Sequence, residues 1–260
     1  MPDIGRFSLF IALAASLYSF GAFIYGVKRE RSEFVASARN GVIAVFVLVS
    51  VAVGALLYAM LTHDFRLDHV ATYSSRSTSV PYLVGAFWAG NEGSLLFWAW
   101  LLSLFAAVAV LGRGGDRRHT AWAASIMMAV AGFFLLLLVG LANPFQKLPL
   151  APEDGLGLNP LLENPAMLFH PPLLLAGYAA FTVPFAFAVA ALVTGRLDGD
   201  WLWHVRKWAL AAWLLLGVGN LLGARTAAAL GIHGITVDHA TLIYQERGRI
   251  GVVEPVVTLR

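Results

Sequence analysis

Six apolar stretches of about 20 residues each limit what this chain can fold into more than any other feature. They lie at residues 7–26, 41–63, 94–112, 121–143, 172–195 and 208–230. A hydrocarbon core about 30 Å thick needs roughly 20 apolar residues in a helix. Because lipid offers no hydrogen bonds, each stretch has to satisfy its own backbone, and the apolar runs do not alternate as barrel strands do. We therefore predict an all-α polytopic membrane protein with about six transmembrane helices.

The overall composition supports a membrane protein and removes several kinds of chemistry. The 260 residues are 59% hydrophobic and only 13% charged. There is no cysteine, which excludes disulfides, thiolate metal sites and thiol redox chemistry within this sequence. The net charge of +3 comes from short basic clusters between the apolar stretches, where such residues report membrane orientation. We therefore expect membrane lipid and no nucleic acid as a partner.

The basic residues alternate from loop to loop, and this predicts the topology. They are concentrated in the first, third and fifth loops, at Lys28, Arg29, Arg31, Arg39, Arg113, Arg117, Arg118, Arg196, Arg206 and Lys207. The second and fourth loops are about 30 residues long and carry few basic residues. By the positive-inside rule the three basic loops are cytoplasmic. We therefore expect both termini and both long loops on the periplasmic side of a bacterial inner membrane.

The second loop ends in an aromatic segment, residues 86–100, that allows two interpretations. It contains Trp88, Glu92 and Trp98 together with two glycines. One interpretation is a compact interfacial turn near a functional site. The other is an aromatic belt at the depth of the lipid headgroups, with Ser94 as a helix cap and Glu92 near the positive helix end. The residues alone do not choose between them.

The fourth loop, residues 143–171, is expected to be rigid and extended because it contains six prolines. It ends in Phe-His-Pro-Pro, which places His170 at the mouth of the fifth predicted helix. A histidine in this position could ligate heme iron, shuttle a proton or anchor the helix at the headgroups. These three roles stay open at this point.

The remaining polar residues within the helical region carry weaker signals. His119 and His204 lie among basic residues and are expected to be solvated, and no His-x-x-His pair suggests zinc. The spans contain no evident Asp, Glu or Lys, which argues against an ion-coupled transporter. Asn220 is about the only polar residue that could line a pathway near the bilayer midplane.

The last part of the chain has a different character and suggests a second unit. Short β-prone runs occur at residues 240–245, 250–253 and 256–259. We therefore divide the chain into a transmembrane helical domain, residues 1–231, and a small periplasmic β tail, residues 232–260, that forms a hairpin. So few strands are marginally stable alone, so we expect the tail to pack against something else.

Several segments together resemble the amino-terminal part of the cytochrome c maturation protein F family (CcmF), the membrane subunit of bacterial heme lyase. The first seven residues match, as do residues 73–76, 88–98 and, most specifically, 157–178 with the Phe-His-Pro-Pro element. The likeness covers roughly residues 1–224.

The resemblance implies that heme is handled and joined covalently to apocytochrome c at the periplasmic face. It implies heme as cofactor, and as partners apocytochrome c and other maturation subunits, including a heme chaperone. In that family the histidine of Phe-His-Pro-Pro is an axial heme ligand, which here is His170. The resemblance also puts the segment with Trp88, Glu92 and Trp98 in the vicinity of the site.

The sequence departs from the family after residue 222. The tryptophan-rich periplasmic segment that contacts heme is expected there, but the sequence continues directly into the β tail. Since one histidine supplies one of two axial ligands, we expect weak heme binding at best, and lyase activity stays open. Two alternatives stay open as well: a non-catalytic scaffold or truncated remnant that docks other maturation subunits, and a heme or small-molecule transporter.

Overall fold

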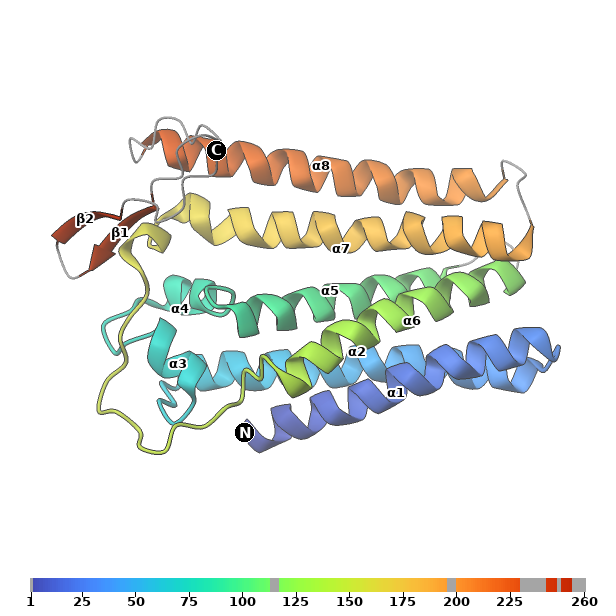
Figure 1. Ribbon diagram of the computed structural model, residues 1–260, viewed down its shortest axis with the longest axis horizontal. Helices are drawn as coiled ribbons and strands as arrows, with labels where there is room; N and C mark the ends of the chain where they lie inside the picture. Colours follow the sequence, from blue (N-terminus) through green and yellow to red (C-terminus); the bar gives the residue numbers. More distant parts are fainter. Residues whose placement is uncertain (1, 113–116, 196–199, 230–241, 247–248, 254–260) are drawn as a thin grey trace.

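A computed structural model describes residues 2–112, 117–195, 200–229, 242–246 and 249–253 (Figure 1). Six long helices dominate it: α1 (Pro2–Lys28), α2 (Ser32–Leu61), α5 (Asn91–Leu111), α6 (Arg117–Gly140), α7 (Pro165–Thr194) and α8 (Asp200–Ala229). Each contains a segment long and apolar enough to cross a membrane. The six predicted membrane-spanning helices are confirmed within the described residues.

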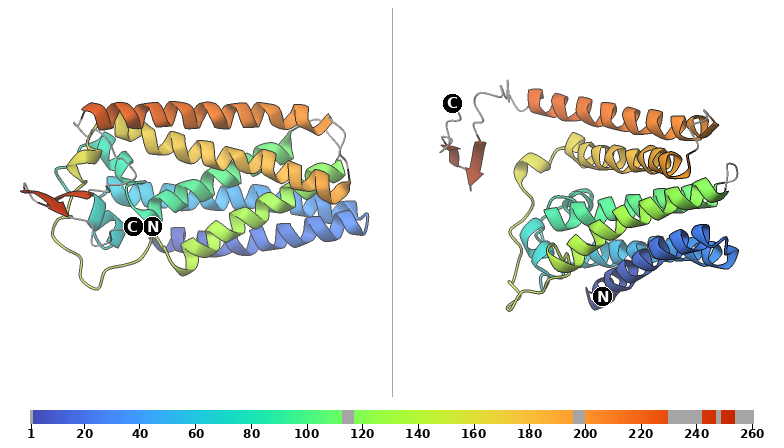
Figure 2. Two further views of the ribbon diagram at one scale, coloured as in Figure 1. Left: turned by 45° about the horizontal axis from the view of Figure 1, so that its top comes forward. Right: turned by 45° about the vertical axis from the view of Figure 1, so that its right-hand side comes forward.

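The helices form a bundle in which α8 is outermost (Figures 1 and 2). Helix α1 packs against α2 and α6, α5 contacts α2, α6 and α7, and α8 packs against α7. Small residues and hydroxyls mediate the close approaches. Ser16 on α1, for example, donates a hydrogen bond to the carbonyl of Met128 on α6 at 2.7 Å. Membrane helices associate through such packing because lipid removes the hydrophobic driving force between them.

Helix α7 begins earlier than the sequence predicts. We expected residues 143–171 to be an extended loop and the helix to start at residue 172, but it starts at Pro165. Asn164 caps the helix, since its side-chain oxygen accepts the backbone N–H of Ala166 at 2.9 Å, and proline is favourable in the first helical position. His170 therefore lies in the second turn of α7, not in a loop.

The two long loops pack against each other at one end of the bundle and form what we call the loop cap, residues 62–90 and 141–164. The cap contains α3 (Asp68–Tyr73), α4 (Val80–Ala86) and one 3-10 turn (Pro160–Leu162). Backbone hydrogen bonds join its halves. The N–H of Leu148 donates to the carbonyl of Arg66 at 2.8 Å, and that of Leu156 to the carbonyl of Ala71 at 2.7 Å.

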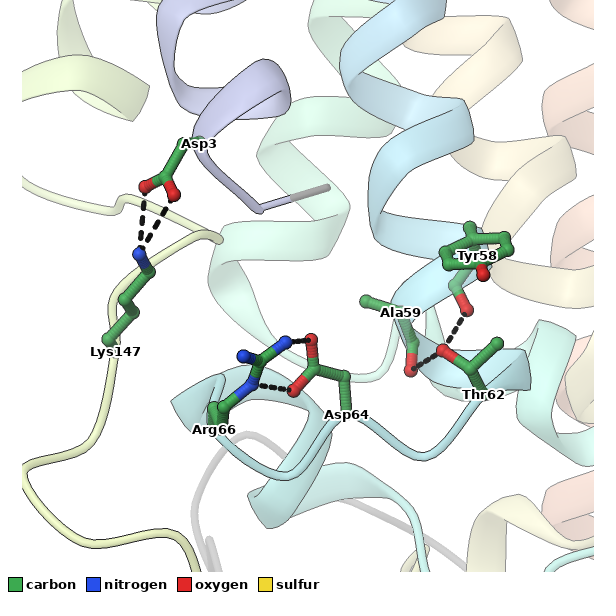
Figure 3. Close-up of polar contacts among 7 residues, drawn as sticks. All are labelled: Asp3, Tyr58, Ala59, Thr62, Asp64, Arg66 and Lys147. Carbon is green, nitrogen blue, oxygen red and sulfur yellow. Dashed lines mark hydrogen bonds and ion pairs between the residues drawn. The ribbon is translucent and has the colours of Figure 1, made fainter.

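Two surface ion pairs lie at the loop cap, and one of them joins it to α1 (Figure 3). Lys147 binds Asp3 at the start of α1 at 2.8 Å, and Arg66 makes two hydrogen bonds to Asp64 at 2.6 and 2.7 Å. Hydrogen bonding by Arg66 lowers the pKa of Asp64 below its ordinary value. A lowered carboxyl pKa stabilises the fold above that ordinary value, and the effect is lost as the pH falls through the folded pKa. Arg66 is largely exposed, so solvent screens the pair and its effect on stability is small.

Two strands are described beyond the helices, β1 (Leu242–Glu246) and β2 (Arg249–Val253). They pair antiparallel, with Leu242 opposite Val253. The third predicted run, residues 256–259, lies outside the described residues. The β tail as a separate periplasmic unit therefore stays a prediction.

Candidate functional site

The imidazole of His170 is fixed by the backbone of the neighbouring helix. Its Nδ1 lies 2.7 Å from the carbonyl oxygen of Gly219 on α8. A carbonyl oxygen can only accept a hydrogen bond, so Nδ1 must carry the proton. In the neutral ring the lone pair is then on Nε2. This is the arrangement by which proteins orient a metal-ligating histidine, with one ring nitrogen donating to a backbone carbonyl.

A second glycine, one turn further along α8, provides the space in which the ring lies. A Cβ atom placed on Gly223 would be 2.5 Å from Cε1 of His170 and 2.8 Å from its Nδ1. Real carbon atoms do not approach so closely. The ring therefore lies against α8 backbone that is open at this point because residue 223 has no side chain.

The other ring nitrogen is available. Within the described part of the chain, Nε2 of His170 has no hydrogen-bond partner, and the side chain is half-buried. This nitrogen is also not fully enclosed by the protein. In the neutral ring Nε2 carries a lone pair in a fixed direction, and axial ligation of heme iron requires such a nitrogen.

Trp88 lies close to this part of α7. With Pro171, the residue after His170, it lines a cavity of about 140 Å³ between the α4–α5 turn, the fourth loop and α7. Sites for larger organic ligands usually have volumes of about 300–1,000 Å³. This cavity is therefore too small to enclose a heme.

Glu92 belongs to a different cluster. Its carboxylate lies 3.7 Å from Nδ1 of His69, which is 4% exposed, and the His69 ring packs against Tyr73 with 4.9 Å between ring centres. Burial, with a contribution from Glu92, raises the pKa of Tyr73. No contact in the described residues joins Glu92 to His170. The two residues lie at the same end of the bundle but do not interact directly.

Trp98 is half-buried between helices. Its ring packs against Phe134 of α6 and stacks on Tyr178 of α7, with ring centres 4.8 and 5.8 Å apart. Ser94 does not cap α5. Its hydroxyl donates to the carbonyl of Trp88 at 2.7 Å and closes the turn before the helix, which begins after Gly90. The segment 86–100 is therefore a short turn at residues 87–90 followed by the start of α5, and the Trp98 ring of this helix packs against neighbouring helices.

The prediction that His119 is solvated is wrong. It is 5% exposed, its Nε2 lies 3.1 Å from the carbonyl oxygen of Phe187, and its ring stacks against Phe187 and Trp201. The basic residues next to His119 in the sequence suggested exposure, but α7 and α8 cover this face of α6. The side chains of the three other histidines in the last quarter of the chain, His204, His233 and His239, lie outside the described residues.

Gly219 and Gly223 were not predicted from the sequence as functional candidates. The signal that could have found them is the Gly-x-x-x-Gly spacing within an apolar stretch, which marks close helix approach in membranes. What that spacing could not show is which side chain occupies the space.

Comparison with known proteins identifies relatives. A family model described as Cytochrome C assembly protein matches residues 88–229. The cytochrome c-type biogenesis protein CcmF of Escherichia coli K12 is 40% identical over 229 residues, which are 87% of this chain and 35% of that protein. CcmF of Haemophilus influenzae is 37% identical over 226 residues, 86% of this chain and 35% of that protein.

A solved structure agrees with the sequence relatives. The cytochrome c heme lyase CcmF superposes with a TM-score of 0.72 at 29% identity, covering 84% of this chain and 34% of that one. The chain thus spans about a third of the length of the relatives it matches.

Proposed function

The chain belongs to the cytochrome c assembly protein family, where it matches the amino-terminal part of CcmF, and from that premise we propose that it holds heme through His170 during covalent heme attachment to apocytochrome c. One observation carries this proposal: the imidazole of His170 is oriented by the Gly219 carbonyl and leaves Nε2 without a partner among the described residues. An anchoring role would not need a fixed tautomer, and a histidine that shuttles protons would have a second polar partner.

The chemistry proposed for the site is addition, with no change in oxidation state. Heme supplies two vinyl groups, and the apocytochrome supplies two thiols. In each addition the sulfur bonds to one vinyl carbon and the proton goes to the other. The contribution of this chain is positional: His170 holds the iron, and the cap end of the bundle presents that site at the membrane surface.

The attachment step needs the site on the periplasmic side, and the predicted orientation provides this. In the structure the loop cap and the start of α1 lie at one end of the bundle, while the loop between α1 and α2 lies at the other (Figure 1). The second end carries exposed Lys28, Arg29 and Arg31. The positive-inside rule makes that end cytoplasmic.

Because the sequence has no cysteine, the orientation can be tested with single introduced thiols. Glu153→Cys in the loop cap and Arg29→Cys at the opposite end are both at exposed positions. We expect a membrane-impermeant maleimide to label the first variant in intact spheroplasts and the second only after the membrane is opened. The reverse pattern would place the site in the cytoplasm and contradict the proposal.

A scaffold function is the second candidate, and the outer face of α8 favours it. Within the described residues α8 packs against α7, and its Trp213 and Leu221 are 70% and 68% exposed. Such a face suits lipid or the helices of other maturation subunits, among them the proposed heme chaperone. A transporter has less support, because the Asn220 side chain donates to the Leu216 carbonyl of its own helix at 2.9 Å and is exposed.

The function is tested by expressing this chain in a bacterium that lacks its own membrane subunit of heme lyase and staining c-type cytochromes for covalent heme. We compare wild type with His170→Ala and with His119→Ala. The second variant removes a histidine that also contacts a backbone carbonyl. Staining that is lost only with His170→Ala supports the proposal. No staining from stably inserted wild type rejects attachment by this chain alone, and staining unaffected by His170→Ala rejects the role of His170.

A further inference from the structure

We propose that Gly223 and the backbone carbonyl of Gly219 are the positioning elements of the heme ligand and that they make Nε2 of His170 the ligating atom. This inference rests on the proposed function, since it concerns the same histidine. It goes further by stating which nitrogen binds iron and why the ligand depends on a helix 49 residues away in sequence.

The assignment of Nε2 follows from hydrogen-bond chemistry. The Nδ1 atom is 2.7 Å from an oxygen that can only accept, so a ligand bond through Nδ1 would require breaking this contact and turning the ring. The carbonyl has two lone pairs, so it can bind the imidazole and still accept its helical N–H. Donation to a carbonyl also raises the basicity of the opposite nitrogen and thereby strengthens a bond to iron.

Gly223 makes room for the His170 ring, because the three atoms nearest to an added Cβ all belong to that ring. A Cβ at Gly223 would meet three atoms of His170, at 2.5, 2.8 and 3.2 Å. A Cβ at Gly219 would instead meet Leu174, and one at Gly217 would meet nothing within 4 Å. The three glycines lie within seven residues of the same helix. Substituting each one therefore tests a different effect: ring positioning at Gly223, helix contact at Gly219 and no contact at Gly217.

Moving α8 away from α7 to make room for a side chain at residue 223 would open a close contact between the two helices. Gly177 of α7 faces α8 so closely that a Cβ there would lie 2.6 Å from Leu216 and 3.1 Å from the carbonyl of Ala212. The two helices are therefore already in contact two turns further along α7. We therefore expect an added methyl group at residue 223 to displace the imidazole, a movable side chain, which would then lose its Gly219 contact.

The first measurement uses wild-type protein without heme. Ring-¹⁵N-labelled histidine is incorporated, and the His170 signals are assigned by their disappearance in His170→Ala. We expect His170 to carry its proton on Nδ1. A proton on Nε2 would overturn the inference, and this readout needs neither a packing variant nor bound heme.

The second measurement compares Gly223→Ala with Gly217→Ala in the purified full chain, titrated with heme and followed by its absorption spectrum. We expect Gly223→Ala to weaken heme binding by roughly 10–100-fold, as loss of an orienting partner does, and to lose the fixed tautomer. Gly217→Ala should match wild type in both respects. Far-UV circular dichroism and size-exclusion elution show whether each variant is folded.

The results separate this inference from the proposed function. If His170→Ala abolishes heme binding while Gly223→Ala keeps both the affinity and the tautomer, His170 is the ligand and the positioning role is wrong. If His170→Ala binds heme as well as wild type, the proposed function fails, whereas the tautomer of His170 still reports on its contact with Gly219. Equal losses in Gly223→Ala and Gly217→Ala would show a general effect on α8 and overturn the inference.

Discussion

Replacing His170 by alanine is expected to weaken heme binding to the purified chain by more than about 100-fold, because loss of an outer partner of a metal ligand alone costs roughly 10–100-fold. The substitution removes the ligating nitrogen itself. The Gly219 carbonyl still accepts the hydrogen bond from its own helix after the substitution. No buried acceptor is left unpaired, so the fold should persist. The measurement is a titration with ferric heme in detergent. The heme is then reduced and carbon monoxide is added, because the absorption spectrum of the carbon monoxide complex depends on the protein ligand on the other side of the iron.

His119→Ala is the matched control for that experiment. His119 is buried and contacts the carbonyl of Phe187, so its loss perturbs packing between helices in a similar way without touching the site. We expect this variant to bind heme as wild type does. Affinity that falls equally in both variants would show that heme binding reports only on bundle integrity, and unchanged affinity in His170→Ala would remove the ligand assignment.

Gly93→Ala is expected to destabilise the protein by about 3 kcal/mol, the upper part of the usual range for overpacking. A Cβ at this position would overlap the carbonyl oxygen of Phe87 and lie 2.9 Å from Cε1 of His69. The first obstacle is backbone, which cannot change rotamer. The turn that carries Trp88 and leads into α5 would have to open, so both stability and the cavity beside Pro171 would be affected.

The control for Gly93→Ala is Gly54→Ala. Both are glycines within helices, but a Cβ on Gly54 meets nothing within 4 Å. Since alanine is the better helix former by about 1 kcal/mol, Gly54→Ala should be neutral or stabilising. Both variants are measured by equilibrium unfolding in mixed detergent micelles with far-UV circular dichroism. If the free energy of unfolding of Gly93→Ala lies within about 0.5 kcal/mol of wild type, the turn relaxes easily and the expected overpacking is wrong.

The membrane helices could be predicted from the sequence, but their ends could not. Apolar length determines which residues can lie in lipid, whereas hydrogen bonding and caps determine where a helix begins. Helix α2 starts at Ser32, nine residues before the predicted apolar stretch, since polar residues continue a helix beyond the bilayer core. Helix α7 starts at Pro165 because Asn164 caps it, and the later prolines at residues 171 and 172 do not prevent this.

The two histidines His170 and His119 show the same limit for the site. The sequence placed the first at a helix mouth and the second among charges, and only the first expectation is close to the structure. Both rings in fact contact a carbonyl of a helix distant in sequence, at Gly219 and Phe187. Local sequence reports on charge and propensity, but it carries no information on which distant backbone covers a side chain.

The sequence by itself determined that this chain crosses a membrane in six helices, and the family resemblance carried in part by its Phe-His-Pro-Pro element suggested heme. Those conclusions depend on local quantities, namely apolar length, backbone hydrogen bonding and a contiguous motif. Only the tertiary structure decided that His170 is held through Nδ1 by α8, that Glu92 pairs with His69, and that Trp98 packs between α6 and α7. Each of these depends on the packing of helices far apart in sequence, where the absence of a side chain at Gly219 and Gly223 matters as much as the residues that are present.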